Sequence, residues 1–284
     1  IGTLDVLGDG QGNVSVAGLS LKGGNVTGSG SLIVAGTIDA HSGQVSAVLG
    51  NSNAALTRLE KTGSGEVTLN NDNTYAGGTM VREGVLSANS GNALGTGAVE
   101  INGGTLNVKA STVNAQNGLV LNGVDAVITS DDGSKSLVVS GTIVAKNGTI
   151  SARLGDAVGG TRLMKTGDGE VSISGDNGDG YAGGTTITAG ILHAASERAL
   201  GDGAVVVNGG SLHIQNNLSL QNGLMLSDGS VAADADKQLS VSGAIELQKG
   251  TLSAKLADGA SSARLTKTRS EERRVGKECL RLCR

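Results

Sequence analysis

The sequence predicts an all-β protein, a parallel β-solenoid in which short strands stack into a rod. Three observations predict it: a long internal repeat, a finer alternation of apolar and polar residues, and an unusual composition. Of the 284 residues, 48 are Gly, none is Pro, Trp or Phe, and the tyrosines are Tyr75 and Tyr181. Aromatic rings supply much of the buried area in conventional cores, so this core must be built from aliphatic side chains.

The long repeat is marked by Arg58, Arg162 and Arg264, which lie 104 and 102 residues apart in the segments TRLEKT, TRLMKT and ARLTKT. A fixed period of this kind is the signature of a repeat architecture. We therefore expect one rod over residues 1–268, made of about two and a half copies with breaks near 58, 162 and 264. Other matching segments are 31–38 with 136–143 and 238–245, 87–106 with 193–212, and 117–121 with 222–226.

Within each copy, short runs alternate apolar and polar residues between turns rich in Gly, Asn, Asp and Ser. Alternation with a period of two is typical of a half-buried strand. Val67 and Leu69 reappear in the second copy as Val171 and Ile173, which indicates that these positions point inward. No stretch shows the spacing of an amphipathic helix. The clearest strands are expected at 67–69, 99–101, 106–108 and 119–121.

Strands this short must bury their apolar side against other strands. A meander sandwich is the alternative, but it normally uses aromatic side chains in its core and gives no reason for the long period. In a solenoid, each coil of about 20–25 residues stacks on the coil below, so the body has about twelve coils. At about 4.8 Å between stacked strands, the rod is roughly 55–60 Å long.

The segment 61–79, KTGSGEVTLNNDNTYAGGT, is expected to form a strand between two tight corners. Asn and Asp at 70–73 favour a turn because they hydrogen-bond their own backbone and tolerate left-handed conformations. The second copy has two extra residues within 176–180, where a solenoid corner tolerates insertion. The glycines expected to supply positive φ are Gly63, Gly65, Gly77 and Gly78.

This segment resembles the passenger-associated transport repeat of bacterial autotransporters. The shared pattern is L-x-K-T-G-x-G-x-[VL]-x-[LI], then N-x-Y-x-G-G-T-x-[VI]-x-x-G-x-L, then A-L-G-x-G-x-[VL]-x-[VI]-N-G-G-[TS]-L. It occurs at residues 59–86 continuing to 93–106, and again at 163–192 continuing to 199–212.

The resemblance implies a right-handed parallel β-helix passenger of a type V secretion system, of the AIDA-like adhesin type. It implies surface display or secretion by a Gram-negative bacterium and anchoring by a C-terminal outer-membrane β-barrel. Such a stalk supports adhesion, autoaggregation or biofilm formation, with host or bacterial cell surfaces, or like passengers, as partners. The chain opens on Ile1 and shows neither a leader nor the barrel, so we expect a fragment.

The last sixteen residues, 269–284, break the third copy and differ from the body. They change the net charge from −7 in the body to −4 overall, and they contain both cysteines, Cys279 and Cys283. The string RSEERRVGKEC resembles a translated sequencing adapter, and we expect a non-native or disordered tail without function. A charged linker or a basic patch is the alternative. The acidic, aromatic-poor body is unsuited to nucleic acid.

A carbohydrate-active β-helix enzyme is the alternative function. Such enzymes use clustered carboxylates, but the clusters here lie in turns where Asp is favoured for backbone reasons. We therefore expect no enzyme and no catalytic residue. A paired-carboxylate site in a cleft would favour the alternative. The clusters are Asp131–Asp132, Asp176 with Asp179, and Asp234 with Asp236.

We also expect no cofactor site and no metal site. Residues 8–16 and 175–184 resemble calcium-binding nonapeptides only faintly, because the regular nine-residue spacing is missing. His193 and His213 occupy polar-face positions about one coil apart, where a solvated pair is the expected arrangement; His41 is the third histidine. The two tyrosines are expected to pack at a corner with their hydroxyls hydrogen-bonded.

Overall fold

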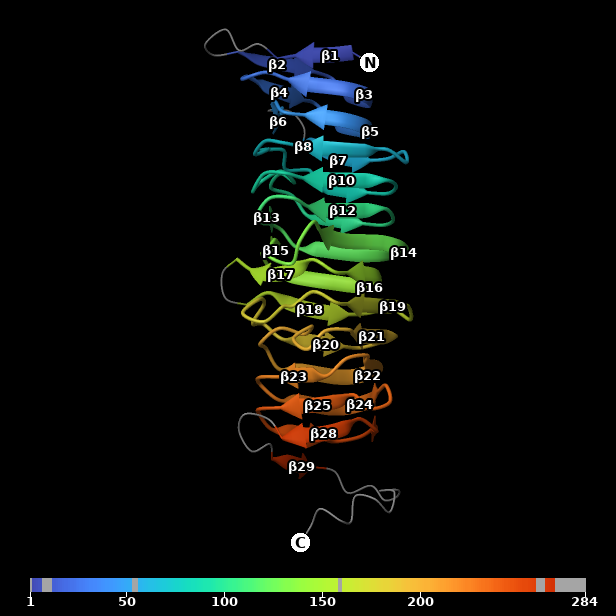
Figure 1. Ribbon diagram of the computed structural model, residues 1–284. Coiled ribbons are helices and arrows are strands. Elements are labelled where there is room, and N and C mark those ends of the chain that lie inside the picture. The colour runs from blue at the N-terminus through green and yellow to red at the C-terminus, as the bar shows by residue number, and fades with distance from the viewer. Residues whose placement is uncertain (1, 7–11, 53–55, 158–159, 259–263, 269–284) are drawn as a thin grey trace.

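The computed structural model describes residues 2–6, 12–52, 56–157, 160–258 and 264–268. Every regular element in these ranges is a strand, and the strands stack in about twelve coils along one axis (Figure 1). The parallel β-solenoid predicted from the repeat is therefore confirmed, while its right-handed winding stays a prediction. No helix in the described ranges is long and apolar enough to cross a membrane. The tail at 269–284, with both cysteines, lies outside the described residues.

One parallel sheet of twenty strands runs the length of the rod and covers two of its sides. Its strands are β1 (Gly2–Asp5), β3 (Leu19–Thr27), β5 (Thr37–Val45), β7 (Arg58–Lys61), β8 (Glu66–Leu69), β9 (Thr79–Val81), β10 (Val85–Ala88), β11 (Val99–Ile101), β12 (Thr105–Val108), β14 (Leu119–Ser130), β16 (Thr142–Ile150), β18 (Arg162–Lys165), β19 (Glu170–Ile173), β20 (Thr185–Ile187), β21 (Ile191–Ala194), β22 (Val205–Ile214), β24 (Leu224–Ala233), β26 (Ile245–Leu247), β27 (Thr251–Leu252) and β29 (Leu265–Lys267).

Long strands in this sheet bend around the corner between the two sides. The first part of β14, residues 119–121, pairs with β11, whereas residues 127–130 pair with β12. In the pairing of β14 with β16, the register shifts between these two parts of β14. We call the side that contains residues 119–121 the first face, and the side that contains residues 127–130 the second face.

A third face is made of three separate three-stranded parallel sheets. They are β2 (Asn13–Val16), β4 (Ser31–Val34) and β6 (Val48–Asn51); β13 (Thr112–Ala115), β15 (Ser136–Val139) and β17 (Arg153–Asp156); and β23 (Leu218–Leu220), β25 (Gln238–Val241) and β28 (Lys255–Asp258). The gaps between these sheets fall at 52–111 and 157–217. Both segments of the repeated motif lie in these gaps.

The core is a set of aliphatic ladders inside the three faces. Val67, Leu69, Val171 and Ile173 are all fully buried, as the alternation predicts. Each stacks on a neighbouring coil in register; Leu69, for example, lies opposite Ala88 of β10. Burying a Val or Leu side chain stabilises a fold by about 1.5–3 kcal/mol, so the ladders hold the rod together without aromatic plugs.

Candidate functional site

The repeated motif lies where the third face has no strand, and a buried asparagine bridges the coils there. The Leu49 amide of β6 donates to Asn73 Oδ1 at 2.8 Å, and Asn73 Nδ2 donates to the Ala93 carbonyl of the next coil at 2.7 Å. Asn177 makes the equivalent two contacts in the second copy, at 2.7 and 2.6 Å. These side chains replace the strand ladder and satisfy backbone groups that would otherwise be buried without partners.

The two tyrosines are buried at the same corners. The hydroxyl of Tyr75 lies 2.6 Å from Thr79 Oγ1, and that of Tyr181 lies 2.9 Å from Thr185 Oγ1. Both rings are fully buried, which confirms the predicted packing and raises the pKa of both hydroxyls. The threonines stand in an inward ladder that is otherwise aliphatic, and the tyrosine hydroxyls explain their presence. A hydroxyl held this way is unavailable to a ligand.

A buried lysine closes each corner from the inside. The Lys61 ammonium donates to the carbonyls of Thr62, Gly63 and Glu83, at 3.1, 2.5 and 3.0 Å. Lys165 makes the equivalent three contacts at 3.0, 2.7 and 3.1 Å. Burial lowers the pKa of both amines, since it disfavours the charged form. Each lysine ties its own corner to the corner of the next coil, and no substrate surface is left at its amine.

The glycines of the motif have two different roles. Gly63 and Gly78 adopt positive φ, 61° and 94°, as predicted. The same prediction was wrong for Gly65 and Gly77, which have ordinary φ. These two are needed for close approach instead: an added Cβ would lie 2.6 Å from the Cβ of Ser42 at Gly65, and 2.6 Å from a backbone carbonyl at Gly77.

The acidic cluster at Asp131 and Asp132 is paired with a cation and with neighbouring donors. Lys135 Nζ lies 3.5 Å from Asp131 and 3.6 Å from Asp132. Asn107 donates to Asp131 at 3.0 Å, and this hydrogen bond holds the pKa of that carboxyl below its usual range. The arrangement is that of a structural corner.

The second cluster is bound in the same way. Asp176 accepts the Gly178 amide at 3.0 Å, and Asp179 lies 3.6 Å from the guanidinium of Arg198. Asp179 also adopts a φ of 54°, a turn conformation that Asp tolerates. The inserted residues therefore lie in a corner, as predicted. Their carboxylates are held by protein donors, which does not favour a calcium roll at this stretch.

The third cluster is divided. Asp236 has a φ of 65° and serves a turn. Asp234 accepts from His213 Nε2 at 2.9 Å, and His213 in turn lies against His193. The two histidines stack in register on β21 and β22, which confirms that they are adjacent on the surface. His41 lies apart from them and contacts Asp39 at 2.9 Å.

The first face carries an outward ladder, one side chain from each successive strand. From β7 to β29 its members pair in unbroken register and alternate with buried neighbours, although Met80 is itself buried. Glu60 and Glu100 carry charge toward its N-terminal end and Glu246 toward its C-terminal end, and the members from Val120 to Met225 are apolar except Thr186. We call this set the outward ladder: Glu60, Met80, Glu100, Val120, Val144, Met164, Thr186, Val206, Met225, Glu246 and Thr266.

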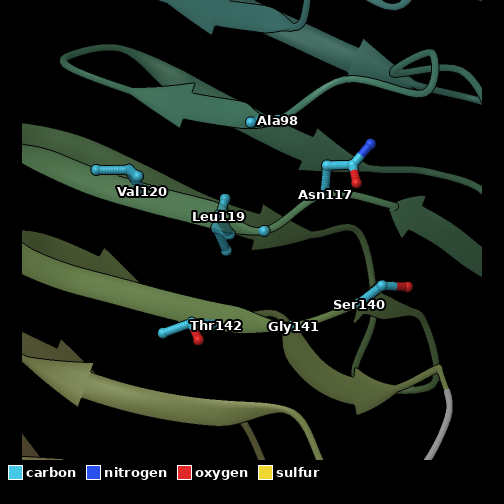
Figure 2. A pocket seen from close by; sticks show the side chains of 8 residues that line it. Ala98, Asn117, Leu119, Val120, Ser140, Gly141 and Thr142 are labelled. Atoms are coloured by element: carbon cyan, nitrogen blue, oxygen red, sulfur yellow. The ribbon is translucent and has the colours of Figure 1, made fainter.

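A shallow hollow of about 300 Å³ opens beside the ladder. Figure 2 shows Val120 and Thr142 on neighbouring strands, with Asn117 and Ser140 at the adjoining corner. Ala98, Leu119 and two glycines complete the lining, which contains no titratable group. The hollow therefore offers no side chain that could act as a general acid or base, or activate the hydroxyls of Ser140 and Thr142.

Comparison with known proteins agrees with this structural assignment. The model of the passenger-associated-transport-repeat family matches residues 59–88 and 163–194, the two segments that contain the asparagine, tyrosine and lysine corners. The chain therefore carries two segments similar to this repeat, which supports an autotransporter passenger.

The chain is also 32% identical over 197 residues to the adhesin BmaC autotransporter of Brucella suis biovar 1 (strain 1330). The aligned part covers 66% of this chain and 5% of that relative's length. No solved structure matches the chain. The likeness is to an adhesin, and it does not favour the carbohydrate-active enzyme considered above.

Sequence reasoning missed the buried lysines and the bridging asparagines. Lys61 follows Leu59 by two residues, so period-two alternation places it on the inward side, and the same holds for Lys165 after Leu163. That spacing was a usable signal. The role of Asn73 had no such signal, because it depends on which coils adjoin the corner.

Proposed function

We propose that this segment is the stalk of a cell-surface passenger of a Gram-negative bacterium and that its first face mediates side-to-side association with a second copy. The observation that carries the proposal is the apolar middle of the outward ladder. Five apolar side chains point outward from the sheet and are half-buried by their neighbours alone: Val120, Val144, Met164, Val206 and Met225.

The shape of this surface favours a flat partner. The ladder runs straight along the rod, and its members are held by the parallel register, so a second rod can lie along it over many coils. Each contact is small, and many small contacts give avidity without a discrete pocket. Autoaggregation and biofilm formation follow from such contacts, while adhesion to host cells requires a partner of a different kind.

The change between copies supports this assignment. In the first copy the ladder holds Glu60 and Glu100, and both lie near Arg58 on the same face, at 3.6 and 3.8 Å. In the second copy the equivalent positions are Met164 and Val206. Loss of both charges leaves an apolar stretch, and exposed apolar surface is what protein contacts use.

The test is the association of the purified chain, measured by sedimentation, with and without Val144→Lys. The matched control is Thr149→Lys, an outward position on the same strand β16 but on the second face. We expect the wild type and the Thr149 variant to associate and the Val144 variant to do so at least about tenfold more weakly, because a charge would be buried without a partner. Equal association of the two variants would contradict a role of the first face in contacts between copies.

A display experiment separates the two parts of the proposal. Cells that display the passenger are scored for autoaggregation and for binding to host cells. Loss of autoaggregation alone in the Val144 variant fits contacts between copies, whereas loss of host-cell binding alone points to a foreign partner on the same face. A rod that sediments as a monomer at every concentration tested contradicts self-association and leaves only the stalk role.

A further inference from the structure

Four side chains form a continuous array across successive coils of the second face. Glu170 Oε2 lies 3.2 Å from His193 Nε2, and Asp234 Oδ1 lies 2.9 Å from His213 Nε2. The two imidazoles face each other through their other nitrogens, with 3.1 Å between the Nδ1 atoms. Their rings are 5.1 Å apart and inclined at 66°. The order of groups along the array is therefore carboxylate, imidazole, imidazole, carboxylate.

The proton positions in this array leave a gap between the histidines. An ionised carboxylate only accepts hydrogen bonds, so each Nε2 beside a carboxylate carries the proton. A neutral imidazole has one proton, and both Nδ1 atoms then present lone pairs to each other. Two lone pairs at 3.1 Å repel unless a shared proton or a metal cation lies between them. The carboxylates thus hold both histidines with the lone pair of Nδ1 directed at the space between the two rings.

The first copy shows what this position looks like without histidines. Its array keeps both acids, Glu66 and Asp131, but places Ser87 and Asn107 between them. Ser87 Oγ donates to Glu66 at 2.6 Å, and Asn107 Nδ2 donates to Asp131 at 3.0 Å. Lys109 Nζ adds a cation 3.0 Å from Glu66. Both carboxylates in the first copy therefore have a donor from the protein, while Asn107 Oδ1 has none.

The second copy replaces these donors and also loses a cation. Gln215 stands where the first copy has Lys109. In the described part of the chain, Glu170 and Asp234 have only the two histidines as ion-pair partners. Two carboxylates and two neutral imidazoles carry a charge of −2, which a divalent cation neutralises.

We propose that His193 and His213 bind one divalent first-row transition metal ion of the Zn²⁺ class through their Nδ1 atoms. Two nitrogens at about 2.05 Å from one ion are about 2.9 Å apart at a right angle and about 3.3 Å apart at the tetrahedral angle. The observed separation of 3.1 Å lies between these values. Glu170 and Asp234 fix the tautomer and the ring orientation, as carboxylates behind zinc-bound histidines do.

Solvent completes the coordination. No group of three or more His, Cys, Asp or Glu side chains that could hold a metal ion occurs among the described residues, so the site has two protein ligands. The His193 side chain is 14% exposed and the His213 side chain 32%, which leaves the ion accessible from one side. Imidazole suits Zn²⁺, Cu²⁺ and Ni²⁺, whereas Ca²⁺ and Mg²⁺ prefer oxygen ligands.

The experiment titrates the full chain with Zn²⁺ by calorimetry, with Cys279→Ser and Cys283→Ser in every protein so that the tail thiols do not bind. The decisive variant is the pair His193→Ser and His213→Asn, which installs the residues of the first copy and so preserves the fold. The matched control is His41→Asn, which removes a histidine that also contacts a carboxylate. We expect one Zn²⁺ per chain in the parent and in the control, and none in the double variant.

Two further measurements test the role of the acids and the ligand type. Glu170→Gln or Asp234→Asn weakens Zn²⁺ binding by about 10–100-fold, the usual effect of removing such a partner. Bound Cu²⁺ shows two equivalent nitrogen ligands by electron paramagnetic resonance. Zn²⁺ binding that survives the double variant overturns the assignment. A parent chain that binds no Zn²⁺ also overturns it, because that result is expected if the two histidines only share a proton.

Discussion

Replacement of Lys165 by Met tests whether the buried lysine of the repeated motif stabilises the corner between neighbouring coils. The Lys165 side chain is fully buried, and its ammonium donates to the carbonyls of Thr166, Gly167 and Ala189 at 3.0, 2.7 and 3.1 Å. Met keeps the unbranched stem and removes only the donors. A fully buried carbonyl left without a donor costs about 1–3 kcal/mol, so about 3–9 kcal/mol is an upper range for these three carbonyls, whose residues are half-buried or exposed.

The lower end of this range applies, because removal of the ammonium also removes the cost of burying it. We therefore expect a loss of about 3 kcal/mol in the free energy of unfolding, measured by chemical denaturation. Lys61→Met is expected to lose a similar amount, since the contacts repeat. Lys146→Met, at an exposed position on β16, serves as the control and changes stability by about 0.5 kcal/mol or less. A Lys165 variant no less stable than this control would refute a stabilising role for the buried lysine.

Three further perturbations follow from the same corners. Tyr181→Phe leaves Thr185 Oγ1 without its partner at 2.9 Å, so thermal and chemical denaturation are expected to show a loss of about 1–2 kcal/mol; unchanged stability contradicts the buried hydrogen bond. Gly190→Ala places a Cβ 2.3 Å from a carbonyl at a φ of 64°, and we expect a loss of at least about 2 kcal/mol, whereas Gly133→Ala, with open space around it, is neutral in the same assay. Acid weakens the fold: a hydrogen bond from Ser87 holds the pKa of Glu66 below its usual value of 4.5. Its contribution is therefore complete only above that usual value, and it is lost as the pH falls through it toward the lowered pKa of the folded state. Denaturation at pH 7 and pH 3 measures this effect, and a fold that is more stable at pH 3 contradicts it.

The fold was predictable because its causes are local in the sequence. Alternation placed Val67 and Leu69 inward, and both are fully buried. The second copy keeps apolar residues at those positions while its polar positions change. Comparison of the two copies within one chain therefore showed which side of the strand points inward. The absence of aromatic plugs then excluded the sandwich on packing grounds.

The corner network was harder to predict because its partners belong to different coils. Asn73 looks like a turn residue, yet it bridges Leu49 and Ala93, which are 24 and 20 residues away. The register that brings these groups together is fixed by the strands on the other two faces. Sequence alone identifies the residue types but not the coil on which each partner lies.

The histidine array depends on register in the same way. His193 and His213 were recognised as neighbours, but their contacts with Glu170 and Asp234 join residues 23 and 21 positions apart. Only the stacked strands show that all four align. The prediction that Gly65 and Gly77 need positive φ was wrong for a related reason, since crowding by an adjacent coil is invisible in a single segment.

Distances between spin labels along the outward ladder test the stacked rod most directly. With both tail cysteines replaced by serine, labelled cysteines are placed at Glu60 with Met164, and at Glu60 with Thr266. Five register steps separate the first pair and ten the second. At about 4.8 Å a step, pulsed electron resonance should give mean separations of about 24 Å and about 48 Å. Two separations that are equal, or that do not double from one pair to the next, would contradict the solenoid and every conclusion drawn from its register.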